Sequence, residues 1–526
     1  MPIDMTQAWI RAWSLNLAVH TYLVFFSVLS PLSHLPHSFT QPPTAPKMRW
    51  VFSAIALAAS SCVTRAAFPS YPNEFVPPSS LLNASNWPDT TIAAQRSIIK
   101  YAEEILREGP WSVMNKSVSP PTGNKHDYLS YRPYFWPDCS KVGNTTELTQ
   151  EQIYVTCPYV GRDGQFNPDY RLANDSGATQ ALMDAVLYAP LAHLILTHNP
   201  NLSKNPPEFY SSAALHALNV FFVDPETSVN PHLNFSQLLR GPGVQKGSPT
   251  GVLDMHWWPK SLTGILLMRE MNVWSEQDIA GVVDWAKRYI PWLLTNELAL
   301  AERGSKNNHA SYYYNQLAAL QILVNDTEGA KATLQDYFTG VYMNQIDANG
   351  DQPEESARTH PYHYRGYNLC AAITNARLAE YVGYDGWNAK AASGAGIQAA
   401  ANYAMGFTPG PGEAASELFP QIAAVAVKFG DPDGKYAAFL ASKDAQYPAR
   451  LWFFWDQPLS DSGLSTGLIA SGGPTDDGGP TGADPNDPDD NTTGGTGTKG
   501  SNGADAVKSS LGLILAGVVV AVVGWF

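Results

Sequence analysis

Hydrophobic residues recur at spacings of three and four along most of the chain, which is the period of an amphipathic helix. The pattern is clear over residues 91–109 and 176–196. A third stretch, 275–294, opens with Ser275 and Asp278, and this pair predicts a capping box at the start of a helix. The same periodicity predicts further helices near residues 258–271, 309–324, 328–343, 365–382, 386–405, 415–428 and 434–443.

Strands should be rare in this region, because few segments alternate between hydrophobic and polar residues. The region also lacks heptads and any fixed repeat period. Helices of this length joined by loops are typical of antiparallel hairpins that stack side by side. We therefore predict an all-α domain over residues 67–460, an (α/α) toroid of antiparallel helix hairpins with a cleft at one end.

A signal peptide is predicted at residues 48–66. Met48 and the basic Arg49 precede an apolar run, and small residues around the expected cleavage site end at Ala66. An earlier apolar stretch makes little sense upstream of such a signal. We therefore expect translation to start at Met48, and we interpret residues 1–47 as an extension of the gene model.

The C-terminal part of the chain predicts a surface anchor. Residues 461–510 are rich in Gly, Pro, Asp and Thr, which is too polar a composition to bury a core, so we expect a disordered stalk. The apolar residues 511–526 follow small residues and a short polar spacer, the pattern of a glycosylphosphatidylinositol (GPI) anchor signal; a tail-anchor helix is the alternative. We therefore expect a secreted, extracellular protein that is GPI-anchored at the cell surface or wall and meets the membrane only through this lipid anchor.

Cysteines and glycosylation sequons agree with secretion. Cys139 and Cys157 are close enough in sequence for a disulfide that closes one loop, and Cys370 should be a buried thiol. Sequons of the form N-x-[ST] are glycosylation acceptors in secreted proteins. They begin here at Asn83, Asn115, Asn144, Asn174, Asn201, Asn234, Asn325 and Asn491.

The charge balance restricts the partners of the protein. The 33 Lys and Arg residues are outnumbered by 47 Asp and Glu residues, and the net charge of −14 argues against a nucleic-acid partner. No glycine-rich nucleotide-binding motif occurs and no Cys/His spacing is typical of zinc, so we expect neither a cofactor nor a metal. The 15 Trp and 25 Tyr residues fit both a core and the walls of a sugar-binding cleft. We expect a monomer.

Three segments combine aromatic and hydrogen-bonding side chains. KHDYLSYRPYFWPD covers residues 125–138, and KNNHASYYYNQ covers 306–316 without a single Asp or Glu. The third segment, DQPEESARTHPYHYRGYNL at residues 351–369, places Arg, His and Tyr side chains before a predicted helix. Because functional residues concentrate on loops that a rigid scaffold carries, we predict that these segments form the site.

The same segments are similar to the motifs of one known family. Residues 307–316 are similar to N-N-H-[GS]-x-[WY], and residues 126–138 to H-D-Y-x-S-x-x-P-Y-[WF]-W-P-D. Residues 357–369 are similar to A-R-T-x-x-x-x-Y-x-x-x-N-L, and RDGQFNPD at 162–169 also fits. The matches follow the family's order within roughly residues 95–400. The chain therefore resembles the alginate lyase family, α/α-toroid polysaccharide lyases that cleave polyuronic acids.

The resemblance implies β-elimination beside a uronate carboxylate. This reaction removes the proton at C5 and expels the oxygen at C4, so negative charge develops next to a carboxylate that is already charged. Asn308 and His309 match the family's carboxylate-neutralising pair, and Arg358 matches its arginine. Tyr364 matches the tyrosine that acts as the acid and, for some linkages, also as the base. His309 or His363 is the alternative base, and a nearby cation should lower the pKa of the tyrosine.

The expected partner is an anionic polysaccharide. Ala310 stands where many members have Gly, so the substrate is left as a uronic-acid polymer of the alginate or glucuronan type. The lack of acidic residues in 306–316 agrees with such a substrate, because carboxylates would repel it. Its further contacts are expected at Tyr128, Tyr131, Arg132, Trp136, His256, Lys260, Tyr362, His363 and Arg365.

Two other kinds of function stay open at this point. An inverting glycoside hydrolase on a similar α/α scaffold would use paired carboxylates, for instance Glu354 or Glu355 with Asp127 or Asp254. A non-catalytic wall protein that binds a uronate polysaccharide would keep the aromatic residues and Arg358 but could lose Tyr364. The nature of the products separates these functions from a lyase.

Overall fold

The structure is a computed structural model of the 526-residue chain, and it describes residues 75–83, 87–143, 147–243 and 245–457. The chain divides into two units, Met1–Thr64 and Arg65–Phe526, and all described residues belong to the second unit. The predicted features at the two ends lie outside the described residues. These are the extension 1–47, the signal 48–66, the stalk 461–510 and the tail 511–526.

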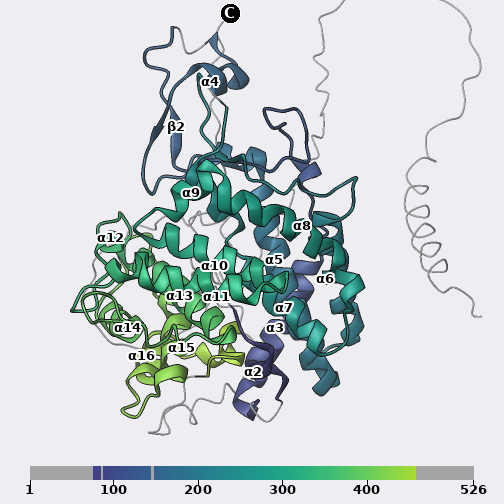
Figure 1. The fold of residues 1–526 in the computed structure, drawn as a ribbon, viewed down its shortest axis with the longest axis vertical. Coiled ribbons are helices and arrows are strands. Elements are labelled where there is room, and N and C mark those ends of the chain that lie inside the picture. The colour runs from purple at the N-terminus through teal and green to yellow at the C-terminus, as the bar shows by residue number, and fades with distance from the viewer. Residues whose placement is uncertain (1–74, 84–86, 144–146, 244, 458–526) are drawn as a thin grey trace, which may run out of the picture. The chain divides into compact units, whose positions relative to one another are not determined.

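Helices account for most of the regular structure of the second unit (Figure 1). The capping box predicted at Ser275 and Asp278 is confirmed, because both of its hydrogen bonds are present at the start of α8. The helices are α2 (Pro78–Leu82), α3 (Ile92–Leu106), α4 (Gln150–Thr156), α5 (Asp175–His198), α6 (Pro207–Phe222), α7 (Trp258–Glu270), α8 (Glu276–Thr295), α9 (Glu297–Arg303), α10 (Asn308–Leu323), α11 (Thr327–Thr339), α12 (Pro353–Ser356), α13 (Pro361–Tyr381), α14 (Ile397–Ala404), α15 (Phe419–Phe429) and α16 (Lys435–Lys443).

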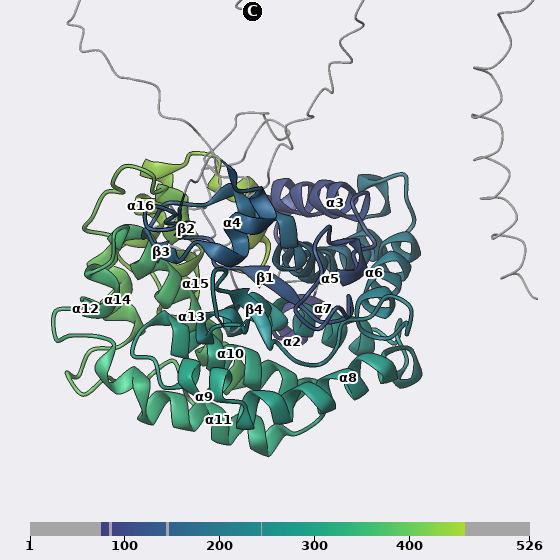
Figure 2. The same cartoon turned by 90° about the horizontal axis from the view of Figure 1, so that it is seen from above.

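The helices of this unit pack as neighbouring pairs. Helix α5 packs against α3, α6 and α7, and α10 packs against α11 and α13. Figure 2 shows these groups following one another around an arc, from α3 through α8 and α11 to α14 and α16. The predicted all-α toroid is therefore confirmed.

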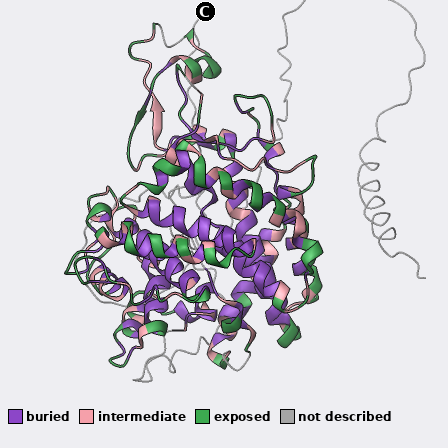
Figure 3. Ribbon diagram, viewed as in Figure 1, coloured by how far each residue is buried: buried purple, intermediate pink, exposed green. Residues whose placement is uncertain are grey.

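The core is built from buried residues of these helix groups, and Figure 3 shows buried residues concentrated towards the middle of the helical body. Gly264 on α7 illustrates how closely these helices approach. A Cβ atom at this position would lie 1.7 Å from the carbonyl oxygen of Val186 on α5. Only glycine permits this approach of two backbones.

Helix α5 is long and apolar enough to cross a membrane by length and composition. In this fold, however, 83% of its most apolar window is buried among the other helices. Pro190 lies within the helix and is itself fully enclosed. We therefore interpret α5 as a core helix of the toroid.

Within the described residues, four short strands form two small sheets at one end of the helical body. Strand β1 (Leu129–Tyr131) pairs in parallel with β4 (Phe235–Leu238), and β2 (Phe135–Pro137) pairs antiparallel with β3 (Tyr159–Gly161). Figure 1 shows β2 and α4 projecting from this end. The segment 125–138, predicted to be a loop of the site, thus contains both β1 and β2.

The projecting segment is closed by a disulfide and held to the body by a buried arginine. The expected disulfide, Cys139–Cys157, links the stretch after β2 to the end of α4 within this segment. The guanidinium of Arg240 lies 4.4 Å from the ring centroid of Tyr131 and 4.7 Å from that of Tyr154. Arg240 also lies 3.5 Å from the carboxylate of Asp169. These cation–π and ionic contacts hold the segment against β4.

One helix prediction was wrong in its bounds, and one long helix was not predicted. Residues 386–405 form a helix only over α14, because Gly394 has a φ of +83° and interrupts the chain before it. Helix α6 was missed, although Pro207 occupies its first position, where proline favours a helix start. Its apolar spacing is weak, and most of its binding to the core comes from packing against α5.

Candidate active site

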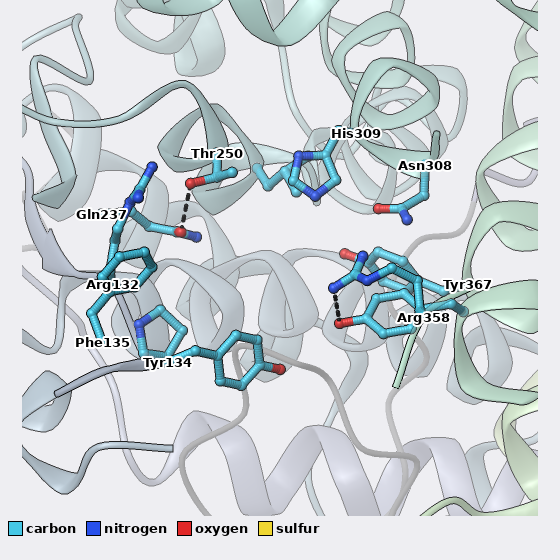
Figure 4. Close-up of a pocket in the computed structure, with 12 residues that line it drawn as sticks. Arg132, Tyr134, Phe135, Gln237, Thr250, Asn308, His309, Arg358 and Tyr367 are labelled. Carbon is cyan, nitrogen blue, oxygen red and sulfur yellow. Dashed lines mark hydrogen bonds between the residues drawn. The ribbon is translucent and has the colours of Figure 1, made fainter. Parts of the chain in front are cut away.

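A pocket opens at the end of the toroid where the small sheets lie (Figure 4). The first turns of α10 and α13 form one wall, and the segment between β1 and β2 forms the opposite wall together with β4. The lining residues are Arg132, Pro133, Tyr134, Phe135, Gln237, Thr250, Leu253, Asn308, His309, Arg358, Tyr364 and Tyr367.

All four residues predicted to be catalytic line this pocket. Asn308 and His309 begin α10, Arg358 follows α12, and Tyr364 lies in the first turn of α13. Figure 4 shows Asn308, His309 and Arg358 pointing into the same space. Segments about fifty residues apart in sequence thus meet as the motifs predicted.

Asn308 is held by a buried carboxylate on the short helix α12. Its backbone N–H donates to Glu355 Oε1 at 2.7 Å, and its Nδ2 donates to Oε2 at 2.6 Å. Asn308 and Glu355 are each 1% exposed. Burial raises the pKa of Glu355, and the two hydrogen bonds from Asn308 lower it by less.

His309 is held by a second buried carboxylate. Its Nδ1 lies 2.8 Å from Oε1 of Glu302 on α9, and the Glu302 side chain is 1% exposed while that of His309 is 21% exposed. Burial lowers the pKa of His309, but the carboxylates of Glu302 and Glu355 raise it by more. The net pKa therefore lies above the ordinary value of a histidine.

These contacts correct one expectation from the sequence. Segment 306–316 contains no acidic residue, but the fold brings Glu302 and Glu355 directly behind His309 and Asn308. Both carboxylates lie behind the pair rather than in the pocket lining. They therefore orient the two side chains without direct contact with an anionic substrate.

Tyr364 contacts Arg358 through both its ring and its hydroxyl. Arg358 donates from Nη2 to the Tyr364 hydroxyl at 2.8 Å, and its guanidinium carbon lies 3.7 Å from the ring centroid. Burial raises the pKa of Tyr364, whereas Arg358 lowers it by less, so the pKa lies above that of an ordinary tyrosine. The expectation that a cation would lower this pKa overall was wrong. The phenol is therefore protonated at neutral pH and suited to donate its proton.

Tyr134 extends this group from the opposite segment. Burial and the neighbouring Tyr364 both raise its pKa, so this second phenol also keeps its proton. Figure 4 shows Tyr134 pointing towards Arg358 and its hydrogen-bonded partner. Asp163 lies 3.4 Å from the guanidinium of Arg358 and also contacts Thr359. Asp163, from the 162–169 motif, therefore helps to hold the Arg358 side chain in place.

The opposite wall of the pocket carries the cationic Arg132 and a residue with an unusual backbone conformation, Gln237. The Arg132 guanidinium lies 4.6 Å from the ring centroid of Phe135, and its buried Nε has no hydrogen-bond partner among the described residues. Gln237 has a φ of +42°, which is unusual for a residue other than glycine. Its side chain accepts from Thr250 at 2.9 Å and donates to Asp254 at 3.1 Å. Strain of this kind is common at functional sites.

Among the nine expected substrate contacts, Arg132 is the one that lines the pocket. Tyr128 is buried in the core, and Tyr131 packs against Arg240. Trp136 lies on β2, where its indole N–H donates to the carbonyl of Gln165 at 2.9 Å. None of the three lines the pocket, and their rings contribute to the packing of β1 and the projecting segment.

The expected contacts on α13 are also used inside the fold. The Tyr362 hydroxyl donates to the carbonyl of Ala415 at 3.1 Å. His363 Nδ1 lies 3.4 Å from Glu417, and Arg365 Nε donates to Ser356 at 2.8 Å. Successive residues on a helix point about 100° apart, so the neighbours of Tyr364 must face away from the pocket.

His256 and Lys260 lie beneath the pocket rather than in it. Both side chains are fully buried. Lys260 forms an ion pair with Asp184 at 2.7 Å, between α7 and α5. Burial lowers the pKa of His256 to about 3, so it is a neutral imidazole under Tyr367. The two residues expected to bind substrate are therefore a polar part of the core.

The three consecutive tyrosines of α10 are all buried. Their hydroxyls donate to the carbonyls of Tyr367 and Leu293 and to the carboxylate of Asp336, from Tyr312, Tyr313 and Tyr314 respectively. All three anchor α10 from different sides, which fixes the helix start that carries Asn308 and His309.

Several lining residues were missed by sequence reasoning. Pro133, Tyr134 and Phe135 were present in the quoted motif, and Tyr367 follows Tyr364 by one helical turn, so helical spacing could have found it. Nothing local marked Gln237, Thr250 and Leu253, which come from separate segments.

The carboxylates considered for a hydrolase do not line the pocket. Glu355 is engaged with Asn308, and Asp254 accepts from Ser130 and Gln237. Asp127 lies 3.2 Å from His232. Within the part of the chain that the structure describes, no cluster of His, Cys, Asp and Glu could hold a metal ion.

Comparison with known proteins agrees with this geometry. A family model described as alginate lyase matches residues 112–414, more than half of the 526-residue chain. The structure is similar to the crystal structure of an alginate lyase from Bacteroides ovatus, with a TM-score of 0.61 and 25% identity over 72% of this chain and 96% of that one. No curated protein matches the sequence. These matches favour a polysaccharide lyase over the glycoside hydrolase and the non-catalytic binding protein considered above. The chain therefore belongs to the alginate lyase family and is a polysaccharide lyase.

Proposed function

We propose that this lyase cleaves a uronic-acid polysaccharide of the alginate or glucuronan type by β-elimination. The observation that carries the proposal is the meeting of Asn308, His309, Arg358 and Tyr364 in one pocket. Amide, imidazole, guanidinium and phenol together supply the hydrogen-bond donors, cation and proton donor that this reaction needs.

Neutralisation of the substrate carboxylate is assigned to the Asn308 and Arg358 side. Removing the C5 proton creates a carbanion whose charge spreads into the carboxylate. A donor and a cation placed there stabilise that charge more in the transition state than in the ground state. The rigid hold of Glu355 on Asn308 keeps the donor in place before substrate arrives.

Tyr364 is assigned the role of acid at O4. Its raised pKa keeps the phenol protonated, and Arg358 stabilises the phenolate that forms when the proton leaves. His309 is the base where the C5 proton lies on the opposite face. Where proton and leaving oxygen share one face, Tyr364 must first lose its own proton; its phenolate, which Arg358 stabilises, then takes the C5 proton and passes it to O4. His363 is set aside as a base because it does not line the pocket.

Binding of an anionic polymer to a chain of net charge −14 needs local cations. Arg132 and Arg358 stand on opposite walls of the pocket and supply them. Phe135 offers an aromatic face of the kind that stacks on a pyranose ring.

We propose further that the protein is secreted and held at the cell surface or wall by a GPI anchor. The signal at 48–66 and the apolar tail at 511–526 support this location. The Cys139–Cys157 disulfide is consistent with an oxidising compartment.

The test is to incubate the protein, purified from a secreting host, with mannuronan, guluronan and glucuronan. A lyase leaves a C4=C5 double bond at each new non-reducing end, and this group absorbs in the ultraviolet. We expect absorbance to rise with at least one polymer. Chain shortening with saturated ends, or no shortening of any of the three, would refute the proposal.

A further inference from the structure

His309 lies between the pocket and a carboxylate buried behind it. One ring nitrogen, Nδ1, lies 2.8 Å from Glu302, and the ring itself points into the pocket (Figure 4). Glu302 belongs to α9, which ends just before the turn that leads into α10. The carboxylate does not line the pocket, so its contact with a substrate is indirect.

This contact selects one tautomer of the imidazole. An ionised carboxylate only accepts hydrogen bonds, so the 2.8 Å approach of Nδ1 to Oε1 of Glu302 favours a proton on Nδ1. A neutral His309 then has its lone pair on Nε2, the nitrogen turned away from Glu302. That is the arrangement of a base oriented by a third group.

Other charges surround the pair. Glu355 from α12 and Arg358 after it act on His309 with opposite signs, and Arg132 from the opposite wall acts on Glu302. Tyr134 and Tyr364, which also line the pocket, stay protonated and carry no charge. When His309 takes up a proton, Glu302 is the carboxylate in contact with the new cation.

Resting on the proposed function, we propose that Glu302 is a positioning residue that presents His309 Nε2 as the acceptor of the C5 proton. In this step the C5–H bond breaks and its proton goes to Nε2, while its electron pair forms the C4=C5 double bond. The C4–O4 bond breaks, and O4 takes the proton of Tyr364. The imidazolium faces Glu302 until both proton carriers exchange with water.

Acceptor and donor are then different groups, and this has a stereochemical consequence. In guluronate the C5 proton and the C4 oxygen lie on opposite faces of the ring, whereas in mannuronate and glucuronate they lie on the same face. The Glu302–His309 pair therefore supplies the base for cleavage at guluronate. At mannuronate and glucuronate, Tyr364 can be both the base, as a phenolate, and the acid.

The experiment compares Glu302→Gln with wild type on guluronan, mannuronan and glucuronan. Glu297→Gln is the matched control, because Glu297 lies on the same helix with its side chain 74% exposed. We expect kcat of Glu302→Gln on guluronan to fall at least about tenfold more than on mannuronan. The acidic limb of guluronan cleavage should also move to lower pH, since His309 loses the carboxylate that raises its pKa. The control should match wild type on all three polymers.

Equal losses on all polymers, or a shift of the alkaline limb instead, would overturn the inference, because His309 would then act as a cation. Cleavage of mannuronan but not guluronan by wild type would also overturn it, while the proposed function would stand. If Glu302→Gln does not fold, NMR titration of His309 in wild type decides, with His309→Gln assigning the signal. A pKa above about 6.5 supports the pair, and a lower value overturns it.

Discussion

Asn308 donates both its backbone N–H and its side-chain amide to the carboxylate of Glu355, at 2.7 and 2.6 Å. A Gln in place of Glu355 offers one oxygen and one NH2 group, so one of the two Asn308 donors would face another donor. We expect Glu355→Gln to lower kcat between about tenfold and a hundredfold, since Asn308 loses its fixed orientation. The free energy of unfolding should fall by about 1–3 kcal/mol. Product absorbance and denaturant unfolding measure the two effects.

The matched control for this change is Glu354→Gln. Glu354 is the exposed neighbour of Glu355 on α12, so the same loss of charge occurs without loss of the Asn308 contact. We expect wild-type activity and stability from the control. If both variants lost activity alike, the effect would come from the net charge and not from Asn308.

Replacement of Tyr364 by Phe removes the proposed acid but keeps the ring that Arg358 covers. We expect kcat to fall by about a hundredfold or more, with little change in substrate retention on an affinity column. Tyr362→Phe is the control, because that hydroxyl is bonded to Ala415 outside the pocket. A Tyr362→Phe variant that lost turnover while Tyr364→Phe kept it would exchange the roles of the two tyrosines.

The difference between these two tyrosines shows what the sequence could predict. The motifs placed Asn308, His309, Arg358 and Tyr364 correctly in one pocket, because α10 begins with the first two and Tyr364 lies in the first turn of α13, while Arg358 lies in the short link between α12 and α13. Helical spacing also separates Tyr364 from its neighbours, since adjacent positions cannot face the same way.

The supporting contacts could not be predicted in the same way. Glu355 meets Asn308 across 47 residues, and Gln237 reaches the pocket from β4 through an unusual backbone conformation. Such pairs depend on how helices and strands close around one another, which no local period encodes. His256 and Lys260 were expected to contact substrate because they are polar, but both side chains are buried and Lys260 is paired with Asp184 within the core.

Lys260 should therefore affect stability rather than substrate binding. Its ammonium group lies 2.7 Å from Asp184, and the side chains are 0% and 3% exposed. Lys260→Met would leave Asp184 as a buried charge without this partner, so we expect a loss of about 3–5 kcal/mol in the free energy of unfolding. The KM of the folded fraction should not change. Lys246→Met, which breaks the exposed pair with Glu297, should cost less than about 1 kcal/mol.

Asp254 predicts how stability depends on pH. Burial raises its pKa to about 6, although Ser130 and Gln237 hydrogen-bond to it. An unfolded aspartate titrates near 3.9, so the folded state holds the proton more tightly. The contribution of this group to stability is therefore fully present below about pH 4 and is lost as the pH rises through about 6.

An asparagine at position 254 removes this titration while keeping the shape of the side chain. We expect the unfolding free energies of Asp254→Asn and wild type to differ between pH 4 and pH 7 by a changing amount, with the variant gaining about 1–3 kcal/mol relative to wild type as the pH rises. Thermal unfolding measured at steps across this range, with the difference between the two proteins plotted against pH, isolates Asp254 from all other groups. A difference that stays constant with pH would show that the pKa of Asp254 is the same in the folded protein and in the unfolded chain. Burial beside Gln237 would then not have raised it.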